Sequence, residues 1–327
     1  MPARTPLPPG LGRAFTTAEA RESGVARSRL RAADLDAPFH GARTRNSAPV
    51  PDPRVDARRV PDAHRRGGEE ARILALADSY LPLMPEDAFF SHVTAAVLWR
   101  LPLPRSALDP REVEVSRFAP RRAPEGRRVR GHRVGPRFAE RTQLGGVPVA
   151  EPSSVWASLA ERLGVADLVA LGDAVVHIDR RSQRALGTVD GLRATAEAGR
   201  RRGIRRLEAA LELIRVGSAS RAESLSRIML LRAGLPEPDL DVEIRDRDDR
   251  LIGYADLGYR RFRIAIEYES RHHRDDDAQW NRDIDKYHEY EAAGWTVIRL
   301  TAWHVFRNPR AGERLVGAAL LRAGWRP

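Results

Sequence analysis

The sequence predicts a mixed fold of the α/β (α+β) class, because runs with strand and helix periodicity alternate along the chain. Several short runs alternate apolar and polar residues with the period of two that places every second side chain on one face of a strand. Longer runs repeat apolar residues every three or four positions, which is typical of an amphipathic helix. The length of 327 residues suits two or three domains. We expect three parts, with bounds at 1–66, 67–216 and 217–327.

Composition narrows the classes of partner. The formal net charge is +11 and the isoelectric point is about 10.9, which favours a polyanion such as DNA. The alternative is a genomic bias towards arginine, since Lys286 is the only lysine in the chain. Cysteine is absent, which excludes disulfides and thiolate metal sites and fits a cytoplasmic protein. No apolar run approaches the roughly 20 residues of a membrane span, so no membrane partner is expected.

The first part is predicted to contain a pair of helices. Residues 15–24 include two threonines that can cap a helix and end at a glycine, and residues 25–33 form the second expected helix. Two short helices joined at a glycine are typical of a helix-turn-helix, with residues 39–43 as a wing strand. The second helix carries the candidate DNA-binding residues where a recognition helix meets phosphates and base edges: Arg27, Ser28, Arg29 and Arg31. The alternative is a small helical bundle with these side chains in solvent.

The middle part is predicted to be a scaffold. A linker or long loop rich in proline and arginine, residues 46–68, precedes it. The patterns then indicate a helix at 71–77, a strand entering a buried helix at 85–99, strands at 113–117, 128–134 and 145–149, and helices at 152–163, 165–175 and 190–216. His92 lacks a partner set typical of catalysis, so we expect a capping or core histidine. No metal-ligand spacing or phosphate-binding glycine loop is present in this part.

Both of these parts resemble the AbiEi family of antitoxins. In that family a helix opening with Phe-Thr, a glycine turn and a basic helix precede an aromatic-x-Gly wing, as in residues 15–43 here. Ser91-His92 followed by Thr94-Ala95-Ala96 is similar to the family's scaffold. The resemblance implies an N-terminal winged helix that binds DNA, a mixed α/β scaffold and a cognate toxin protein as partner.

Two strand-like runs in the last part bring acidic residues together. In the second run Phe262, Ile264, Ile266 and Tyr268 share one face, whereas Arg263, Ala265, Glu267 and Glu269 share the other. Asp256 lies near the end of the preceding strand, from which antiparallel pairing would bring it within reach of Glu267. Carboxylate oxygens suit Mg²⁺ or Mn²⁺, and such an ion can activate water beside a phosphate. The alternative is that Glu267 and Glu269 face solvent.

The motifs around these acids resemble the nucleases related to very-short-patch-repair (Vsr-like) endonucleases, within the PD-(D/E)XK superfamily. They are Asp256, then the run from Glu267 to His273, then Arg282-Asp283-Ile284-Asp285-Lys286, then Gly294-Trp295-Thr296-Val297-Ile298-Arg299. The resemblance implies a restriction-endonuclease-like mixed sheet flanked by helices and a magnesium-dependent endodeoxyribonuclease. Asp256, Glu267 and the Tyr268 carbonyl would hold Mg²⁺ or Mn²⁺. His273, Asp283 and Lys286 take the family's histidine, helix aspartate and helix basic positions.

The chain departs from the family pattern at Glu269-Ser270, where Asp-Gly is usual. Glu269 also occupies the place where the superfamily often has a lysine, so it is a candidate metal ligand rather than a cation. Lys286, Arg282 or His273 would then supply the positive charge from the helix side, unless Lys286 serves only Asp283. The departure also leaves open a catalytically silent DNA-binding regulator or antitoxin. A purely protein-binding antitoxin is the third alternative.

The helix that opens the last part carries one more candidate. Ser220 and Glu223 have the spacing of a capping box, which requires no catalytic function. In the resembled nucleases a Ser-x-x-Glu-Ser helix opens the domain and directs its glutamate at the metal site, which makes Glu223 a candidate catalytic residue and Arg227 a supporting one. Further along, Trp280, Ile284 and Tyr287 have helical spacing and are expected to pack on the sheet.

Overall fold

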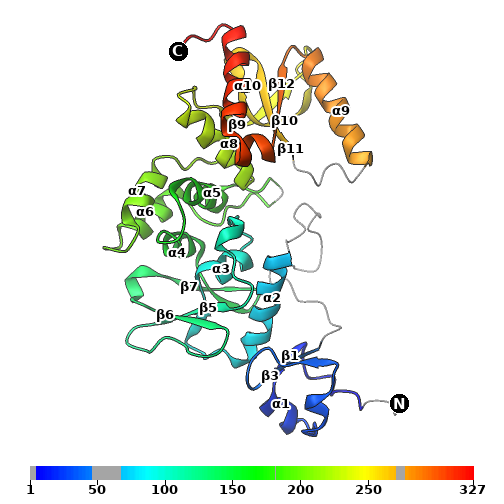
Figure 1. The fold of residues 1–327 in the computed structure, drawn as a ribbon, viewed down its shortest axis with the longest axis vertical. Helices are drawn as coiled ribbons and strands as arrows, with labels where there is room; N and C mark the ends of the chain where they lie inside the picture. Colours follow the sequence, from blue (N-terminus) through cyan, green and yellow to red (C-terminus); the bar gives the residue numbers. More distant parts are fainter. Residues whose placement is uncertain (1–4, 46–67, 181, 270–276) are drawn as a thin grey trace. The chain divides into compact units, whose positions relative to one another are not determined.

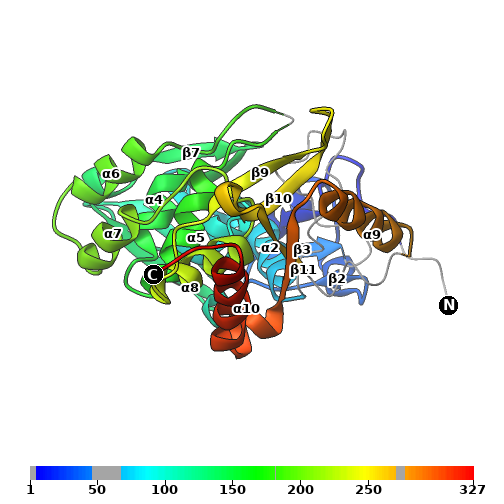
Figure 2. The same cartoon turned by 90° about the horizontal axis from the view of Figure 1, so that it is seen from above.

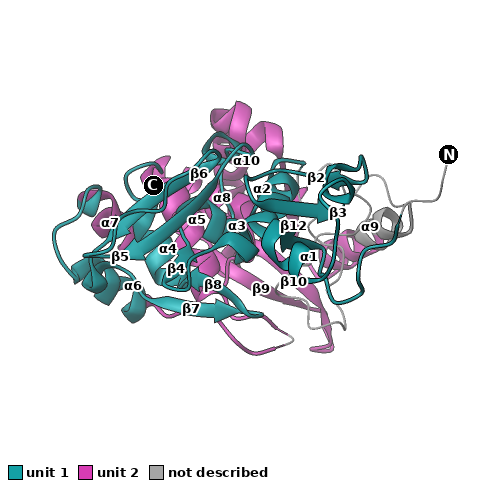
Figure 3. Ribbon diagram, turned by 90° about the horizontal axis from the view of Figure 1, so that it is seen from below, with its two compact units in different colours: residues 1–163, 190–204 teal, residues 164–189, 205–327 magenta. Residues whose placement is uncertain are grey.

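The computed structural model describes residues 5–45, 68–180, 182–269 and 277–327, and for residues 277–284 it describes the backbone alone. The fold is of the mixed α/β class, as the sequence predicts (Figure 1). The chain forms two compact units, Met1–Leu163 with Asp190–Ile204 and Gly164–Val189 with Arg205–Pro327 (Figure 3). Residues 164–189 and 205–216, which we expected in the scaffold, therefore belong to the second unit. In the described part of the chain no helix is both long enough and apolar enough to cross a membrane.

The N-terminal module of the first unit combines one short helix with a small sheet. Strands β1 (Ala14–Thr16), β3 (Ala42–Arg45) and β2 (Leu35–Asp36) pair antiparallel in that order. Helix α1 (Thr17–Glu22) begins at Thr16, whose hydroxyl accepts a bond from the Glu19 backbone N–H in a capping box. Gly24 follows with φ +80, so the expected glycine turn is confirmed.

The predicted second helix at residues 25–33 is wrong. Only Arg29–Arg31 form a single 3₁₀ turn there. The Arg43 side chain donates a 2.7 Å bond to the Leu30 carbonyl, which in an α-helix would accept from the backbone N–H four residues later. Val25 and Leu30 instead pack into a small core with Phe15 and Ala20. The expected wing strand at residues 39–43 begins later than predicted, since β3 starts at Ala42.

The main sheet of the first unit has five strands in the order β6-β5-β4-β8-β7. They are β4 (Ala88–Phe90), β5 (Val113–Phe118), β6 (Val129–Val134), β7 (Arg141–Leu144) and β8 (Val147–Ala150). The helices of this unit are α2 (Gly68–Tyr80), α3 (His92–Leu98), α4 (Pro152–Ser158) and α6 (Val189–Glu197). The structure confirms the predicted strands and helices of this region; β7, which is short and polar, was not predicted.

The second unit is built on a four-stranded mixed sheet. Strands β9 (Asp239–Arg245), β10 (Leu251–Tyr259) and β11 (Ile264–Glu269) pair antiparallel, and β12 (Thr296–Thr301) pairs parallel to β11. A parallel pair requires a crossover, which helix α9 (Asp277–Ala292) supplies. The remaining helices are α5 (Val165–Val176), α7 (Ile204–Leu211), α8 (Arg221–Arg232) and α10 (Pro309–Arg322).

Helices cover both faces of this sheet, with α9 on one side and α8 and α10 on the other (Figure 2). The α8–α10 face holds Ile264 and Ile266 of β11, together with Leu230 and Leu320. The opposite face holds Ala265 with Tyr290 of α9. The predicted alternation of β11 is therefore confirmed, and Glu267 emerges on the α9 side because it shares the parity of Ala265.

A buried ion pair links α8 to α5 within the second unit. The Arg227 and Asp173 side chains are fully buried and lie 3.1 Å apart. Arg227 also donates to the Leu213 carbonyl and to Glu237, while the Ser224 hydroxyl donates to Asp173. Burial raises the pKa of Asp173, and the charge of Arg227 opposes that effect. Arg227 thus supports the helix that carries Glu223 by anchoring it to α5.

Replacement of Arg227 by methionine should destabilise the second unit by about 3–5 kcal/mol, because it leaves a buried carboxylate without its cation. Chemical unfolding followed by circular dichroism measures this loss. Arg232→Met, at an exposed position of the same helix, is the matched control and should change the stability by less than about 0.5 kcal/mol. Equal effects of the two substitutions would contradict the role of the pair.

Candidate functional site

Acidic residues and one lysine lie where the pairing between β10 and β11 stops, within β10 and towards the end of β11. The Asp256 carboxylate accepts a 2.7 Å hydrogen bond from the Tyr268 backbone N–H. Glu267 is only 6% exposed, and its Oε1 lies 2.7 Å from the Lys286 ammonium. Lys286 reaches over from α9 and also donates a 3.1 Å bond to the Tyr254 carbonyl. The structure thus places Lys286 beside Glu267, so Lys286 does not serve Asp283 alone.

A break in the alternation of β10 sets the position of Asp256. Ala255 packs on the α9 face, whereas Leu257 packs on the α8–α10 face, although residues two apart share a face in a regular strand. The β10–β11 ladder includes Leu257 to Tyr259 and stops before Asp256. On the neighbouring strand Asp241 has φ +52, in the left-handed region. At the point where the pairing of β10 and β11 stops, the Asp256 carboxylate therefore accepts the hydrogen bond of a backbone N–H of β11, that of Tyr268.

Glu223 takes part in a capping box, which is one of the two roles considered for it. The Ser220 hydroxyl accepts from the Glu223 backbone N–H and caps α8, while the Glu223 carboxylate accepts a 2.8 Å bond from the Ala219 N–H. Burial raises the pKa of Glu223 to about 7, and the negative charge of Asp256 adds to this shift. The charge of Asp256 therefore acts on the Glu223 carboxyl group, which also supports the helix start, and the catalytic role of Glu223 stays a prediction.

Tyr290 is a member of this group that the sequence reasoning missed. Its side chain is fully buried, and its hydroxyl has no hydrogen-bond partner among the described residues. Burial raises the Tyr290 pKa, and the charges of Glu267 and Asp256 raise it further. A Cβ at Gly253 would come within 2.8 Å of this hydroxyl, so the glycine makes room for it. The sequence signal that could have found Tyr290 is its spacing. It follows Lys286 by four residues, which places both side chains on the same face of a helix.

The other candidates around this site have different surroundings. Glu269 forms an ion pair with Arg299 of β12, so its charge is neutralised by a neighbouring strand. His273 lies outside the described residues. Arg282 and Asp283 lie in the described backbone of α9, but their side chains are outside the described part, and their predicted roles stay predictions.

The candidate DNA-binding residues of the N-terminal module fall into two groups. Arg29 is only 12% exposed, because its guanidinium donates two bonds to the Asp34 carboxylate and a third to the Thr5 carbonyl. Its predicted contact with DNA is therefore not supported by this structure. Arg27, Ser28 and Arg31 are exposed and remain available to a partner.

A second group of ionisable side chains lies in the sheet of the first unit. His92, expected as a capping or core histidine, opens α3 without capping it, and its Nδ1 lies 3.0 Å from the Ser91 hydroxyl and 3.8 Å from Glu114. The Nε2 of His132 lies 2.9 Å from the same carboxylate oxygen of Glu114. The two imidazole rings stack with their centroids 3.8 Å apart. Neither Glu114 nor His132 stood out in the sequence, because they lie on separate strands.

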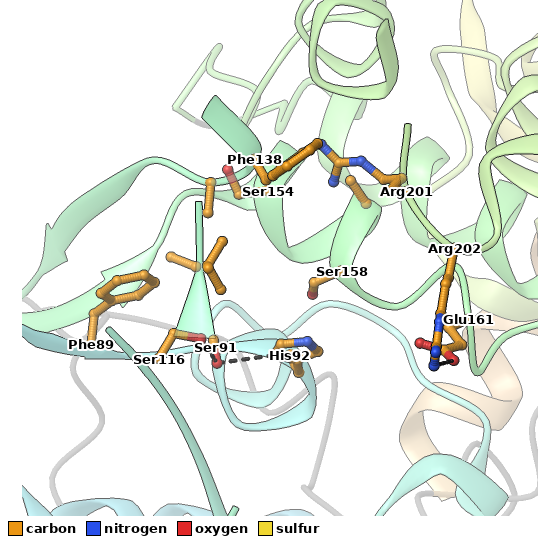
Figure 4. A pocket seen from close by; sticks show the side chains of 14 residues that line it. Phe89, Ser91, His92, Ser116, Phe138, Ser154, Ser158, Glu161, Arg201 and Arg202 are labelled. Carbon is orange, nitrogen blue, oxygen red and sulfur yellow. Dashed lines mark hydrogen bonds and ion pairs between the residues drawn. The ribbon is translucent and has the colours of Figure 1, made fainter. Parts of the chain in front are cut away.

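The charges of this second group follow from its surroundings. Burial would raise the pKa of Glu114, but hydrogen bonds from His132 and Arg162 outweigh it and lower the pKa to about 2. Burial and the neighbouring His132 lower the pKa of His92 to about 3. At neutral pH the carboxylate is therefore ionised and His92 is neutral. Beside the group lies a cavity of about 260 Å³, which His92, Ser91, Ser116 and Arg201 help to line (Figure 4).

No family model and no solved structure matches the chain. Two uncharacterized proteins of Mycobacterium tuberculosis, one from strain CDC 1551 / Oshkosh and one from a second strain, are 28% identical to it over 141 residues. The match covers 39% of this chain and 52% of each relative, so the chain spans about half the length of the relatives it matches.

The raised pKa of Glu223 predicts a pH-dependent stability. The folded state keeps the Glu223 proton up to about pH 7, whereas an unfolded glutamate loses it near its ordinary value of about 4.3. Stability should therefore fall as the pH rises through this window, by on the order of 2 kcal/mol. Glu223→Gln should remove this fall in unfolding experiments at pH 5 and pH 8. The exposed Glu212→Gln is the control, and a parent-like pH profile for Glu223→Gln would refute the assignment.

Proposed function

We propose that this protein binds DNA and hydrolyses its phosphodiester bonds at the site formed by Asp256, Glu267 and Lys286 in the presence of a divalent cation. The observation that carries the proposal is that Asp256 accepts a hydrogen bond from the Tyr268 backbone N–H, one residue beyond Glu267, whose carboxylate pairs with Lys286. Glu267 pairs at 2.7 Å with the Lys286 ammonium, and the charges of Glu267 and Asp256 both act on the Tyr290 hydroxyl. Glu223 adds a third carboxyl group beside Asp256. The resemblance to Vsr-like nucleases points to the same residues.

The donor set of this site fits Mg²⁺ or Mn²⁺. Both ions prefer oxygen ligands, and Asp256, Glu267 and the Tyr268 carbonyl offer oxygens at neighbouring positions. The raised pKa of Glu223 reflects the negative charge of Asp256 as well as burial, and a cation bound beside them would offset that charge. A bound Mg²⁺ or Mn²⁺ would lower the pKa of a water molecule and neutralise charge on the phosphate.

The chain's own residues would hold and orient the reacting groups. Lys286 would supply the positive charge that Glu269, as a carboxylate, cannot supply; Glu269 itself is paired with Arg299. The Lys286 side chain is about 29% exposed, so it is accessible to a phosphate while it remains bonded to Glu267. Glu223, protonated up to about pH 7, can hold a proton close to Asp256. Arg282 and His273 remain further candidates from the α9 side.

The exposed Arg27, Ser28 and Arg31 are the proposed DNA contacts of the N-terminal module, where they would act mainly on phosphates. The net charge of +11 supports a polyanionic partner. The proposed setting is cytoplasmic, in a toxin-antitoxin or phage-defence system with a cognate toxin protein. The second candidate function, a catalytically silent DNA-binding regulator or antitoxin, is favoured by the Glu269–Arg299 pair, which leaves the superfamily's usual lysine position without a cation.

Plasmid nicking tests the proposed reaction. The parent protein should nick supercoiled DNA in the presence of Mg²⁺ or Mn²⁺, and nicking should stop when EDTA is added. Glu267→Gln and Asp256→Asn should each slow nicking by at least about a hundredfold. Even the loss of a residue that only hydrogen-bonds to a metal ligand lowers metal affinity or activity roughly 10- to 100-fold, and these two residues are the proposed ligands themselves. Glu243→Gln, at an exposed position of the adjacent strand β9, should nick like the parent.

A gel shift at several salt concentrations, run beside the nicking assay, separates the candidate functions. Salt-dependent binding without nicking by the parent would support the silent regulator. Absence of both binding and nicking would favour a protein-binding antitoxin. Equal nicking by Glu267→Gln and the parent would eliminate the proposed site.

A further inference from the structure

We propose that His92, Glu114 and His132 form a second metal site, which binds a divalent transition metal ion of the zinc class in the first unit. Among the residues that the structure describes, they are the only group of three or more histidine and acidic side chains whose ligand atoms all lie within 4.8 Å of one another. This site is separate from the acidic site of the second unit, and neither proposal depends on the other.

Three adjacent strands bring the ligands together. His92 follows β4, Glu114 lies in β5 and His132 lies in β6, and these strands are neighbours in the order β6-β5-β4. The Ser91 backbone N–H donates a 3.0 Å bond to the Glu114 carbonyl, which fixes the start of α3 against β5. The sheet therefore positions all three side chains on a rigid scaffold.

The ligand separations suit a tetrahedral ion. One oxygen of Glu114 lies 2.9 Å from the Nε2 of His132 and 3.8 Å from the Nδ1 of His92. An ion with bonds of about 2.1 Å holds its ligand atoms roughly 3.4 Å apart in tetrahedral geometry. Shifts of about half an ångström in these two separations would reach this value, together with a turn of the two imidazole rings out of their 3.8 Å stack so that both ring nitrogens face the ion.

The donor types select the class of metal. Imidazole nitrogens suit zinc, iron, nickel and copper, whereas Mg²⁺ prefers oxygen ligands alone. Two histidines and one carboxylate are a set found at zinc sites that keep a further position open. The adjoining cavity of about 260 Å³, which His92 and Ser91 line, leaves space for a water molecule or small ligand at that position (Figure 4).

Two further features hold the ligands in place. His92 has φ +47, a left-handed conformation that costs a residue with a side chain about 1–3 kcal/mol and is typical of functional positions. Glu114 is oriented by Arg162, which donates to its other oxygen, and by the Thr94 hydroxyl, which accepts from its backbone N–H at 2.8 Å. Such second contacts commonly orient metal ligands.

Titration of the full-length protein with Zn²⁺ and Co²⁺ tests the proposal. The parent should bind one Zn²⁺ tightly, with a rise in its melting temperature, and should gain the visible absorption of tetrahedral Co²⁺. His132→Gln and Glu114→Gln should weaken binding at least about tenfold and lose the absorption. His40→Ala removes an exposed histidine of the same unit and should bind like the parent.

Circular dichroism melting checks that each variant is folded, and His132→Gln is informative even if Glu114→Gln unfolds, because His132 is 21% exposed. Asp256→Asn should retain the Co²⁺ absorption, so that failure of the nuclease proposal leaves this test intact. The proposal is overturned if the parent lacks the tetrahedral Co²⁺ absorption, or if folded His132→Gln binds Zn²⁺ as tightly as the parent.

Discussion

The ion pair between Glu267 and Lys286 connects the crossover helix α9 to the middle of the C-terminal sheet, and the arrangement of the acidic site depends on it. A buried carboxylate requires a partner, because taking a lone charge out of water costs several kcal/mol. The 2.7 Å contact meets this requirement and holds the chain's only lysine among acids. Its bond to the Tyr254 carbonyl ties the same ammonium to β10. The Lys286 side chain thus connects helix α9 to strands β10 and β11 at the candidate site.

Acidic side chains are concentrated around the Glu267–Lys286 pair. The neighbourhood contains Glu223, Asp256 and Glu267, and Lys286 pairs with the last of these. Glu223 responds with a pKa near 7, because burial and the charge of Asp256 both disfavour its ionised form. At Asp173, by contrast, the cation Arg227 opposes the effect of burial. A bound divalent cation would lower the pKa of Glu223, as the charge of Arg227 does for Asp173.

Periodicity is the part of this structure that the sequence could predict. It placed Glu267 on the face opposite Ile266, and the antiparallel pairing of the Asp256 strand was confirmed. It could not predict the break in β10 at Asp256, since that depends on how two strands part. The helix at residues 25–33 was wrong because a distant arginine, Arg43, takes the Leu30 carbonyl. The sequence could not predict the group of His92, Glu114 and His132 for a similar reason. Its members lie far apart in the chain, and the pairing of neighbouring strands brings them together.

The most direct measurement of the central claim is the titration of glutamate side chains by carbon-13 NMR of their carboxyl groups. The account predicts one glutamate with a pKa near 7 in the parent, which moves towards the ordinary value of about 4.3 in Asp256→Asn and on addition of Mg²⁺. A parent in which every glutamate titrates in the ordinary range, unaffected by Asp256→Asn or Mg²⁺, would contradict the claim that these carboxylates form a cation site.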